Sequence, residues 1–316
     1  MGILSSIFRH KHKIVTSDNS VDDNPWVGLF SYEDPEEVER EGRKPKQFRG
    51  RDEELHSVAQ LIIGNIFVTL YGKSGTGKTS LLNAGVFPLL RQKRFLPVSI
   101  RLEMDARNGS FQQCIIDKLV KAVTDHQGSQ ETINVVEKPE DEQQPDYLWS
   151  YFARTRFVNS EGQTVFPVLV FDQFEEIFRD RIPEAEVLLR QIAYLMDESH
   201  ALSPRLVDGK PYTYDFNFRF VTSIREDELY RLEDSIDNCY LPALKRCRYR
   251  LRGLKKPGAK DVILVPGEGL FKAGEQEDIA KTIIDKSRNK DETHNPNIVS
   301  LLCSRIYVDY LRSGAD

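Results

Sequence analysis

The sequence predicts an α/β fold in which helices flank a parallel β-sheet, with a small helical unit after it. Two observations support this prediction. Short apolar segments rich in β-branched residues alternate along the chain with segments of helical spacing, as in folds built from strand–helix–strand units. From residue 278 onward, only helical spacing recurs. The strands are expected at residues 65–71, 96–102, 165–171, 218–224 and 248–254.

Helices are expected where apolar residues recur every three or four positions. Within residues 51–63, for example, Leu55, Val58 and Ile62 would share one face. Polar or proline-rich segments are expected to have little regular structure, and those at 125–146 and 200–217 are also expected to be exposed. The expected helices are 51–63, 80–87, 111–124, 147–157, 183–196, 227–237, 241–245 and 278 to the end, and the expected irregular segments are 24–50, 125–146 and 200–217.

The composition is that of an ordinary soluble protein. Of the 316 residues, 40% are hydrophobic and 29% are charged, which is sufficient for a buried core. A net charge of −5 gives no indication of nucleic-acid binding. No apolar run approaches the roughly 20 residues of a membrane span. We therefore expect no transmembrane segment. The four cysteines are scattered, as expected of reduced thiols, so we expect a cytoplasmic protein.

The chain is expected to have three parts. Residues 1–23 are polar and form a mobile tail. Residues 24–254 hold the strands and form the α/β domain. Residues 255–316 form the helical, lid-like domain. No internal repeat is visible in the sequence.

Residues 72–79 carry the most specific motif of the chain. They read Gly-Lys-Ser-Gly-Thr-Gly-Lys-Thr, which matches the phosphate-loop pattern G-x-x-x-x-G-K-[ST]. The motif follows an apolar strand and precedes a helix start, which is the context that such a loop needs. Its glycines let successive backbone N–H groups point at phosphate oxygens, and the helix N-terminus adds its dipole. Lys78 would reach the β- and γ-phosphates, and the Thr79 hydroxyl would ligate Mg²⁺.

The expected nucleotide-binding residues surround this motif. A nucleoside triphosphate would be held by backbone groups of the whole loop and by the first residue after it. These residues are Gly72, Lys73, Ser74, Gly75, Thr76, Gly77, Lys78, Thr79 and Ser80.

A cluster of acidic residues follows the strand expected at 165–171. A buried strand that ends in Asp172 would place a carboxylate at the carboxyl edge of the sheet, where it would hold Mg²⁺ through water. Glu175 and Glu176 lie just beyond and are both candidates for polarising the attacking water. Spacing alone does not choose between these two glutamates.

Arg225 directly follows the strand expected at 218–224. An arginine at this position could contact the γ-phosphate and sense its presence. A salt bridge to one of the nearby acidic residues is an equally good reading of the same sequence. Both readings stay open at this point.

Six segments resemble the novel STAND NTPases, a bacterial group of P-loop ATPases. The likeness extends over about residues 24–310 and is most specific at Asp-Gln-Phe-Glu-Glu-Ile-Phe, which begins at Asp172. It is loose over residues 255–271, where the family has a helix and a proline. The segments that carry it are residues 24–29, 48–55, 72–90, 172–178, 223–227 and 297–303.

The resemblance implies a function as an ATP-dependent switch. Such proteins bind ATP or ADP with Mg²⁺, assemble into oligomers in the ATP state and are reset by slow hydrolysis. Many act in bacterial defence against phage. In relatives the segment around Arg51 lies near the adenine, so the resemblance adds Arg51 to the nucleotide-binding residues. It also implies a P-loop ATPase fold of the AAA+-like, STAND type.

Members of that family normally carry an effector at one end and a ligand-sensing repeat array at the other, and this chain departs from that plan at both ends. Only about 23 residues precede the segment at 24–29 where the resemblance begins, and no repeat array follows the helical unit. We therefore expect either a piece of a longer protein or a core that works with a separate effector or sensor protein.

The sequence leaves other functions beside the ATPase switch to consider. One alternative is an interaction scaffold that holds nucleotide without turnover and acts through its N-terminal tail or helical end. A GTPase is disfavoured because the chain has no N-K-x-D motif. A small-molecule kinase would need an acceptor site, for which the sequence gives no sign.

Overall fold

The computed structural model describes residues 24–105, 109–132, 141–196, 206–207, 210–211, 218–238, 246–271 and 274–313. The expected tail at 1–23 and the expected helix at 241–245 lie outside these residues. The chain forms two compact units, each made of segments that are separate in sequence. One unit comprises residues 1–57, 72–88 and 251–316, and we call it the loop unit because it contains the phosphate loop. The other comprises residues 58–71 and 89–250, and we call it the sheet unit. The expected boundary between residues 254 and 255 stays a prediction.

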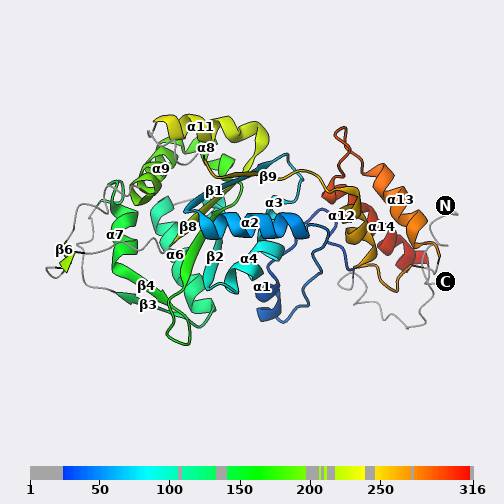
Figure 1. The fold of residues 1–316 in the computed structure, drawn as a ribbon, viewed down its shortest axis with the longest axis horizontal. Helices are drawn as coiled ribbons and strands as arrows, with labels where there is room; N and C mark the ends of the chain where they lie inside the picture. Colours follow the sequence, from blue (N-terminus) through cyan, green and yellow to red (C-terminus); the bar gives the residue numbers. More distant parts are fainter. Residues whose placement is uncertain are drawn as a thin grey trace. The chain divides into compact units, whose positions relative to one another are not determined.

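The sheet unit is built on five strands in the order β2-β5-β8-β1-β9 (Figure 1). The pairs β2–β5, β5–β8 and β1–β9 are parallel. β8 is joined to β1 by a hydrogen bond of 3.2 Å from Thr222 Oγ1 to Thr69 Oγ1, both of them buried. The parallel α/β sheet predicted from the sequence is confirmed. The strands are β1 (Phe67–Gly72), β2 (Phe95–Ile100), β5 (Phe166–Phe171), β8 (Arg219–Arg225) and β9 (Arg248–Arg250).

The central strands are buried on both faces, which is why they are continuously apolar. All but the first residue of β5 are buried, and the aromatic ring of Phe171 stacks on that of Phe220 in β8 at 6.1 Å. Ser110 caps α6 by accepting a hydrogen bond from the backbone N–H of Gln113, and α6 packs on β2 and β5. The helices of this unit include α6 (Phe111–Asp125), α7 (Tyr147–Arg154), α9 (Ile182–Met196) and α11 (Leu229–Asn238).

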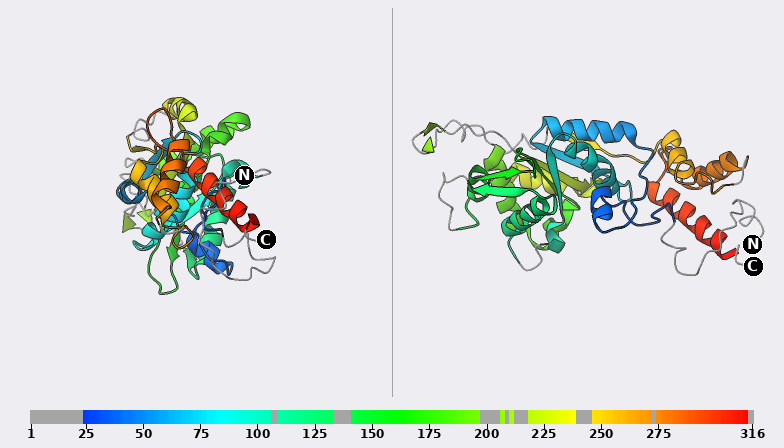
Figure 2. Two further views of the ribbon diagram at one scale, coloured as in Figure 1. Left: turned by 90° about the vertical axis from the view of Figure 1, so that its right-hand side faces the viewer. Right: turned by 90° about the horizontal axis from the view of Figure 1, so that it is seen from below.

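The loop unit has its own core around three helices that pack on one another, α12 (Lys256–Leu264), α13 (Gln276–Lys286) and α14 (Pro296–Ser313) (Figures 1 and 2). The Trp26 ring is 1% exposed and lies among their apolar side chains. Its Nε1 donates a hydrogen bond of 2.9 Å to the Val262 carbonyl. The same unit contains the short helix α3 (Lys78–Ser80), and a π-helical segment follows it at Leu81–Val86.

Several local predictions were wrong. The segment 125–146 contains β3 (Ser129–Thr132), which pairs antiparallel with β4 (Thr155–Val158). The segment 24–50 has little regular structure, as expected, apart from the short helix α1 (Pro35–Arg40), whose N-terminus is capped by Asp34. The helix expected from residue 278 is interrupted between α13 and α14. There, buried His294 exchanges two backbone hydrogen bonds of 2.8 Å with Leu254, and Pro296 starts a new helix.

None of the helices in the described ranges is long and apolar enough to cross a membrane.

Candidate nucleotide-binding site

The phosphate loop adopts a conformation that only glycine accommodates without strain. β1 ends at Gly72, and both Gly75 and Gly77 have positive φ angles, of 75° and 84°. A side chain at Gly72 would also collide with the backbone, since its Cβ would lie 2.3 Å from the Leu251 carbonyl oxygen. The loop then enters α3 at Lys78, so its N–H groups and the helix N-terminus face the same place.

Lys78 is held in position at the base of the loop. Its Nζ donates hydrogen bonds to the carbonyl oxygens of Gly72, at 3.0 Å, and Lys73, at 3.3 Å. The Thr76 hydroxyl also donates to the Lys73 carbonyl, at 2.9 Å. These bonds hold the amine against the backbone of the loop.

Arg51 braces the loop from the side. Its side chain is only 2% exposed, and its Nη2 donates a hydrogen bond of 2.7 Å to the Thr76 carbonyl. Glu54 lies 3.5 Å from the same guanidinium and balances its charge. A buried arginine bound to a loop carbonyl therefore stabilises the curled backbone directly. The family resemblance implied that Arg51 lies near the nucleotide, and this contact with the loop carbonyl was not expected from it.

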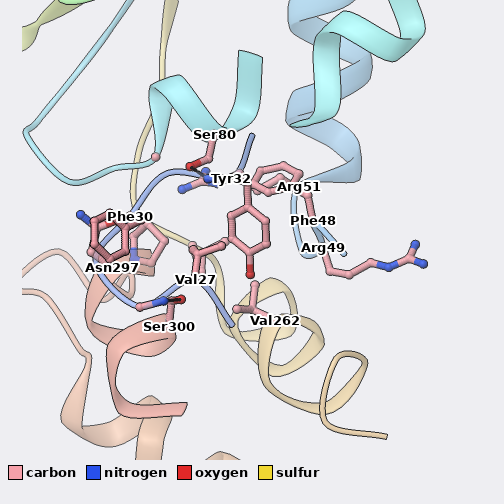
Figure 3. A pocket seen from close by; sticks show the side chains of 14 residues that line it. Val27, Phe30, Tyr32, Phe48, Arg49, Arg51, Ser80, Val262, Asn297 and Ser300 are labelled. Atoms are coloured by element: carbon pink, nitrogen blue, oxygen red, sulfur yellow. Dashed lines mark hydrogen bonds between the residues drawn. The ribbon is translucent and has the colours of Figure 1, made fainter. Parts of the chain in front are cut away.

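A pocket opens beside the loop within the same unit. It encloses about 430 Å³, part of which is open to solvent. Gly77 and Ser80 contribute the side nearest the loop, and Figure 3 shows the side chains around the pocket. The rest of the lining is largely apolar and comes from Val27, Phe30, Tyr32, Phe48, Leu254, Val262 and Pro296.

Tyr32 is the central aromatic residue of this pocket. Its ring lies 5.3 Å from that of Phe48 at an angle of 73°, and its hydroxyl bonds to Ser300 of α14. Burial raises the pKa of Tyr32 far above its usual value, so the phenol stays neutral. Its backbone N–H donates a 3.1 Å hydrogen bond to the Ser80 hydroxyl. An apolar wall of this kind suits a flat heterocycle joined to phosphates in the loop.

The acidic residues expected at the end of β5 lie in the sheet unit. Asp172 is 9% exposed and follows the last residue of the strand. Gln173, the next residue, has a left-handed backbone with φ 53°. This turn leads into Glu175, which is 5% exposed, and Glu176. The two glutamates have different partners.

Glu176 is bound by Arg101, which lies just after β2. The guanidinium contacts both carboxylate oxygens, at 2.8 and 2.5 Å, and this pairing raises the pKa of Arg101. Glu175 instead accepts a 3.3 Å hydrogen bond from the backbone N–H of Arg225 at the end of β8. The sequence analysis did not single out Arg101, although its place directly after a strand was an available signal.

The Arg225 guanidinium is paired with Asp227. The two hydrogen bonds measure 3.0 and 2.6 Å, and they raise the pKa of Arg225. This is the salt bridge that the sequence left open as one reading of the residue. A role of Arg225 toward a γ-phosphate stays a prediction.

Within the sheet unit, the order of the strands brings Asp172 and Arg225 to one edge of the sheet. β8 lies between β5 and β1, and the carboxyl ends of parallel neighbours meet at the same edge. Asp172 follows β5, Arg225 ends β8, and the phosphate loop continues from β1. A phosphate loop after one strand and an aspartate after another strand of the same parallel sheet define a P-loop NTPase.

Comparison with known proteins agrees with this class. A family model described as Novel STAND NTPase 1 matches residues 25–302, and the chain belongs to this family. The resemblance stated from the motifs is thereby confirmed. A search of curated protein sequences found no match.

Three similar solved structures share the fold of this chain. They are Cdc6p from Pyrobaculum aerophilum (16% identity, TM-score 0.50), ORC2 from Aeropyrum pernix (14%, 0.50) and a Walker-type ATPase of Pyrococcus abyssi (14%, 0.50). The matches cover 85%, 84% and 84% of this chain and 64%, 62% and 69% of those chains, respectively. This chain therefore spans less than two thirds of the length of the first two.

Proposed function

We propose that this protein is an adenine-nucleotide switch that binds ATP or ADP, hydrolyses ATP slowly and signals through its nucleotide state. The observation that carries the proposal is the phosphate loop itself, preformed by Lys78 and braced by Arg51 beside an apolar pocket. The similar ORC2 structure contains ADPNP and ADP, by its description, which supports an adenine nucleotide in this fold.

Different residues bind the phosphates and the base of the nucleotide. Backbone N–H groups of the loop and the Lys78 ammonium take the phosphates, because both are preorganised donors. The base lies in the pocket against Tyr32 and Pro296, where apolar contact replaces water. The Ser80 hydroxyl accepts a hydrogen bond from the backbone N–H of Tyr32. This bond fixes the position of the base pocket relative to the phosphate loop.

Magnesium fits the donors that the chain offers. The Thr79 hydroxyl and the Asp172 carboxylate are oxygen ligands, the type that Mg²⁺ prefers, and Asp172 is nearly buried. Mg²⁺ commonly takes its other ligands from phosphates and water. When bound, the ion would neutralise charge on the phosphates.

Glu175 is the better candidate for orienting the attacking water. Glu176 is committed to Arg101 through two hydrogen bonds, and breaking them would leave the arginine unpaired. Glu175 is buried at the sheet edge and bonded to the end of β8. That bond also links Glu175 to Arg225, so a change at the γ-phosphate could pass from one residue to the other.

The nucleotide state is proposed to control oligomerisation and signalling, with bacterial defence as the setting. This part rests on the family and on the implied roles of its members. A separate effector or sensor protein would supply the output. Light scattering after size exclusion, with ADP and with a non-hydrolysable ATP analogue, tests it. A larger mass with the analogue supports the switch, and equal masses with both ligands contradict it.

The binding proposal is tested by calorimetry. Wild type should bind ADP and ATP, and Lys78→Ala should lose measurable binding because the loop loses its cation. Lys121→Ala, which removes an exposed lysine from α6, is the matched control and should bind normally. Unchanged binding by the Lys78 variant would refute the proposed site. Binding without any turnover would leave a nucleotide-holding scaffold as the function.

A further inference from the structure

Helix α14 brings a side-chain amide to the phosphate loop. Asn297 is the second residue of α14 and lines the pocket beside the loop (Figure 3). A Cβ placed on Gly75 would lie 3.2 Å from Asn297 Nδ2. The amide nitrogen therefore lies against the tip of the loop, more than 200 residues along the chain from it.

The position of Asn297 is fixed by its neighbours. The Asn295 side-chain oxygen accepts hydrogen bonds from the backbone N–H groups of Asn297, at 3.0 Å, and Ile298, at 3.4 Å, and so caps the helix. The Pro296 ring lies against Gly77, with its Cγ 3.7 Å from where a Cβ would stand. The start of α14 is thus anchored to the loop independently of the Asn297 side chain.

The side-chain amide of Asn297 carries N–H groups that can donate hydrogen bonds. Within the described residues its side chain makes no hydrogen bond, although it is half-buried. A primary amide has two N–H donors, and a partly buried donor gains most from a charged acceptor. The base would occupy the apolar part of the pocket, whereas Asn297 lies beside Gly75 in the part that cradles phosphates.

We propose that Asn297 donates a hydrogen bond to a phosphate oxygen of the bound nucleotide and so ties α14 to the phosphate loop. This inference rests on the proposed function, because it requires a nucleotide in the loop. It makes Asn297 a positioning residue through which the helical part of the loop unit recognises the phosphates. The cap by Asn295 and the contact of Pro296 then serve to present this amide.

The test compares ADP with adenosine by calorimetry in wild type and three variants. Asn297→Ala should weaken ADP binding about tenfold, in the range of one hydrogen bond to a charged acceptor, and leave adenosine binding unchanged. Asn297→Asp should weaken ADP binding at least tenfold further, because a carboxylate then faces the phosphates. Ile298→Asp adds the same charge at an exposed neighbour on α14, and should change ADP binding less than threefold.

A structural role would give a different pattern. An acid in the first turn of a helix is favourable, so Asn297→Asp should keep or raise the melting temperature while it loses ADP. Equal loss of ADP and adenosine would overturn the inference, since it would place Asn297 at the base or sugar. Normal ADP binding by Asn297→Ala would also overturn it and leave the proposed function intact. No ADP binding by wild type would overturn both.

Discussion

Replacing Arg51 by methionine should destabilise the loop unit and weaken nucleotide binding together. The substitution keeps an unbranched apolar stem but removes the donor to the Thr76 carbonyl, which lies 2.7 Å from Nη2. It also removes the partner of Glu54, which lies at 3.5 Å and whose side chain is 19% exposed. A hydrogen bond from a charged donor contributes about 1.5–3 kcal/mol. The partly solvated Glu54 adds little to this, because it can turn to water.

We therefore expect the free energy of unfolding of Arg51→Met to fall by about 2–3 kcal/mol. Urea unfolding followed by circular dichroism measures this, and calorimetry should show weaker ADP binding since the loop carbonyl is no longer held. Arg49→Met is the matched control. Arg49 is exposed and its guanidinium points away from the pocket (Figure 3), so its loss should change stability by less than about 0.5 kcal/mol. Equal effects of the two substitutions would refute the role of Arg51 as a brace.

Three further predictions follow from local geometry. Gly72→Ala should abolish ADP binding in calorimetry, because its Cβ would meet the Leu251 carbonyl oxygen at 2.3 Å; normal binding would show that the loop can shift. Gln173→Gly should raise the free energy of unfolding in urea by about 1 kcal/mol, because glycine adopts the left-handed turn without strain; a loss of stability would contradict this. Burial raises the pKa of Cys114 to about 11, so the unfolded thiol ionises before the folded one. The melting temperature should therefore fall as pH rises from about 9 to 11, and Cys114→Ala should fall less over the same range.

The strands and the phosphate loop were predictable because their signals are local. β5 and β8 are buried on both faces and so had to be apolar, and the loop octet fixes both its own conformation and its place after β1. The order of the strands could not be predicted from the sequence, because pairing between β8 and β1 joins segments about 150 residues apart.

Other features depend on contacts that no local pattern records. β3 exists only because it pairs with β4 across α7, and polar composition alone predicted an exposed segment there. The break before α14 depends on His294 meeting the backbone of Leu254. Asn297 belongs to a motif quoted from the sequence, yet its place beside Gly75 is set by the packing of the loop unit.

The site itself was predictable in its residue types and not in its pairings. Glu175 and Glu176 were equivalent by spacing, and Arg101 distinguishes them only because β2 and β5 are neighbours in the sheet. The contact of Arg225 with Asp227 could likewise not be chosen from the sequence, and a role of this residue toward a γ-phosphate stays a prediction.

Release of inorganic phosphate from ATP with Mg²⁺, measured over many turnovers, tests the central claim most directly. Wild type should release several equivalents, Lys78→Ala none, and Glu175→Gln at least tenfold less than wild type while still binding ATP. Glu176→Gln should retain more activity than Glu175→Gln, because its carboxylate serves Arg101. The absence of turnover by wild type, or full activity of Glu175→Gln, would contradict the account.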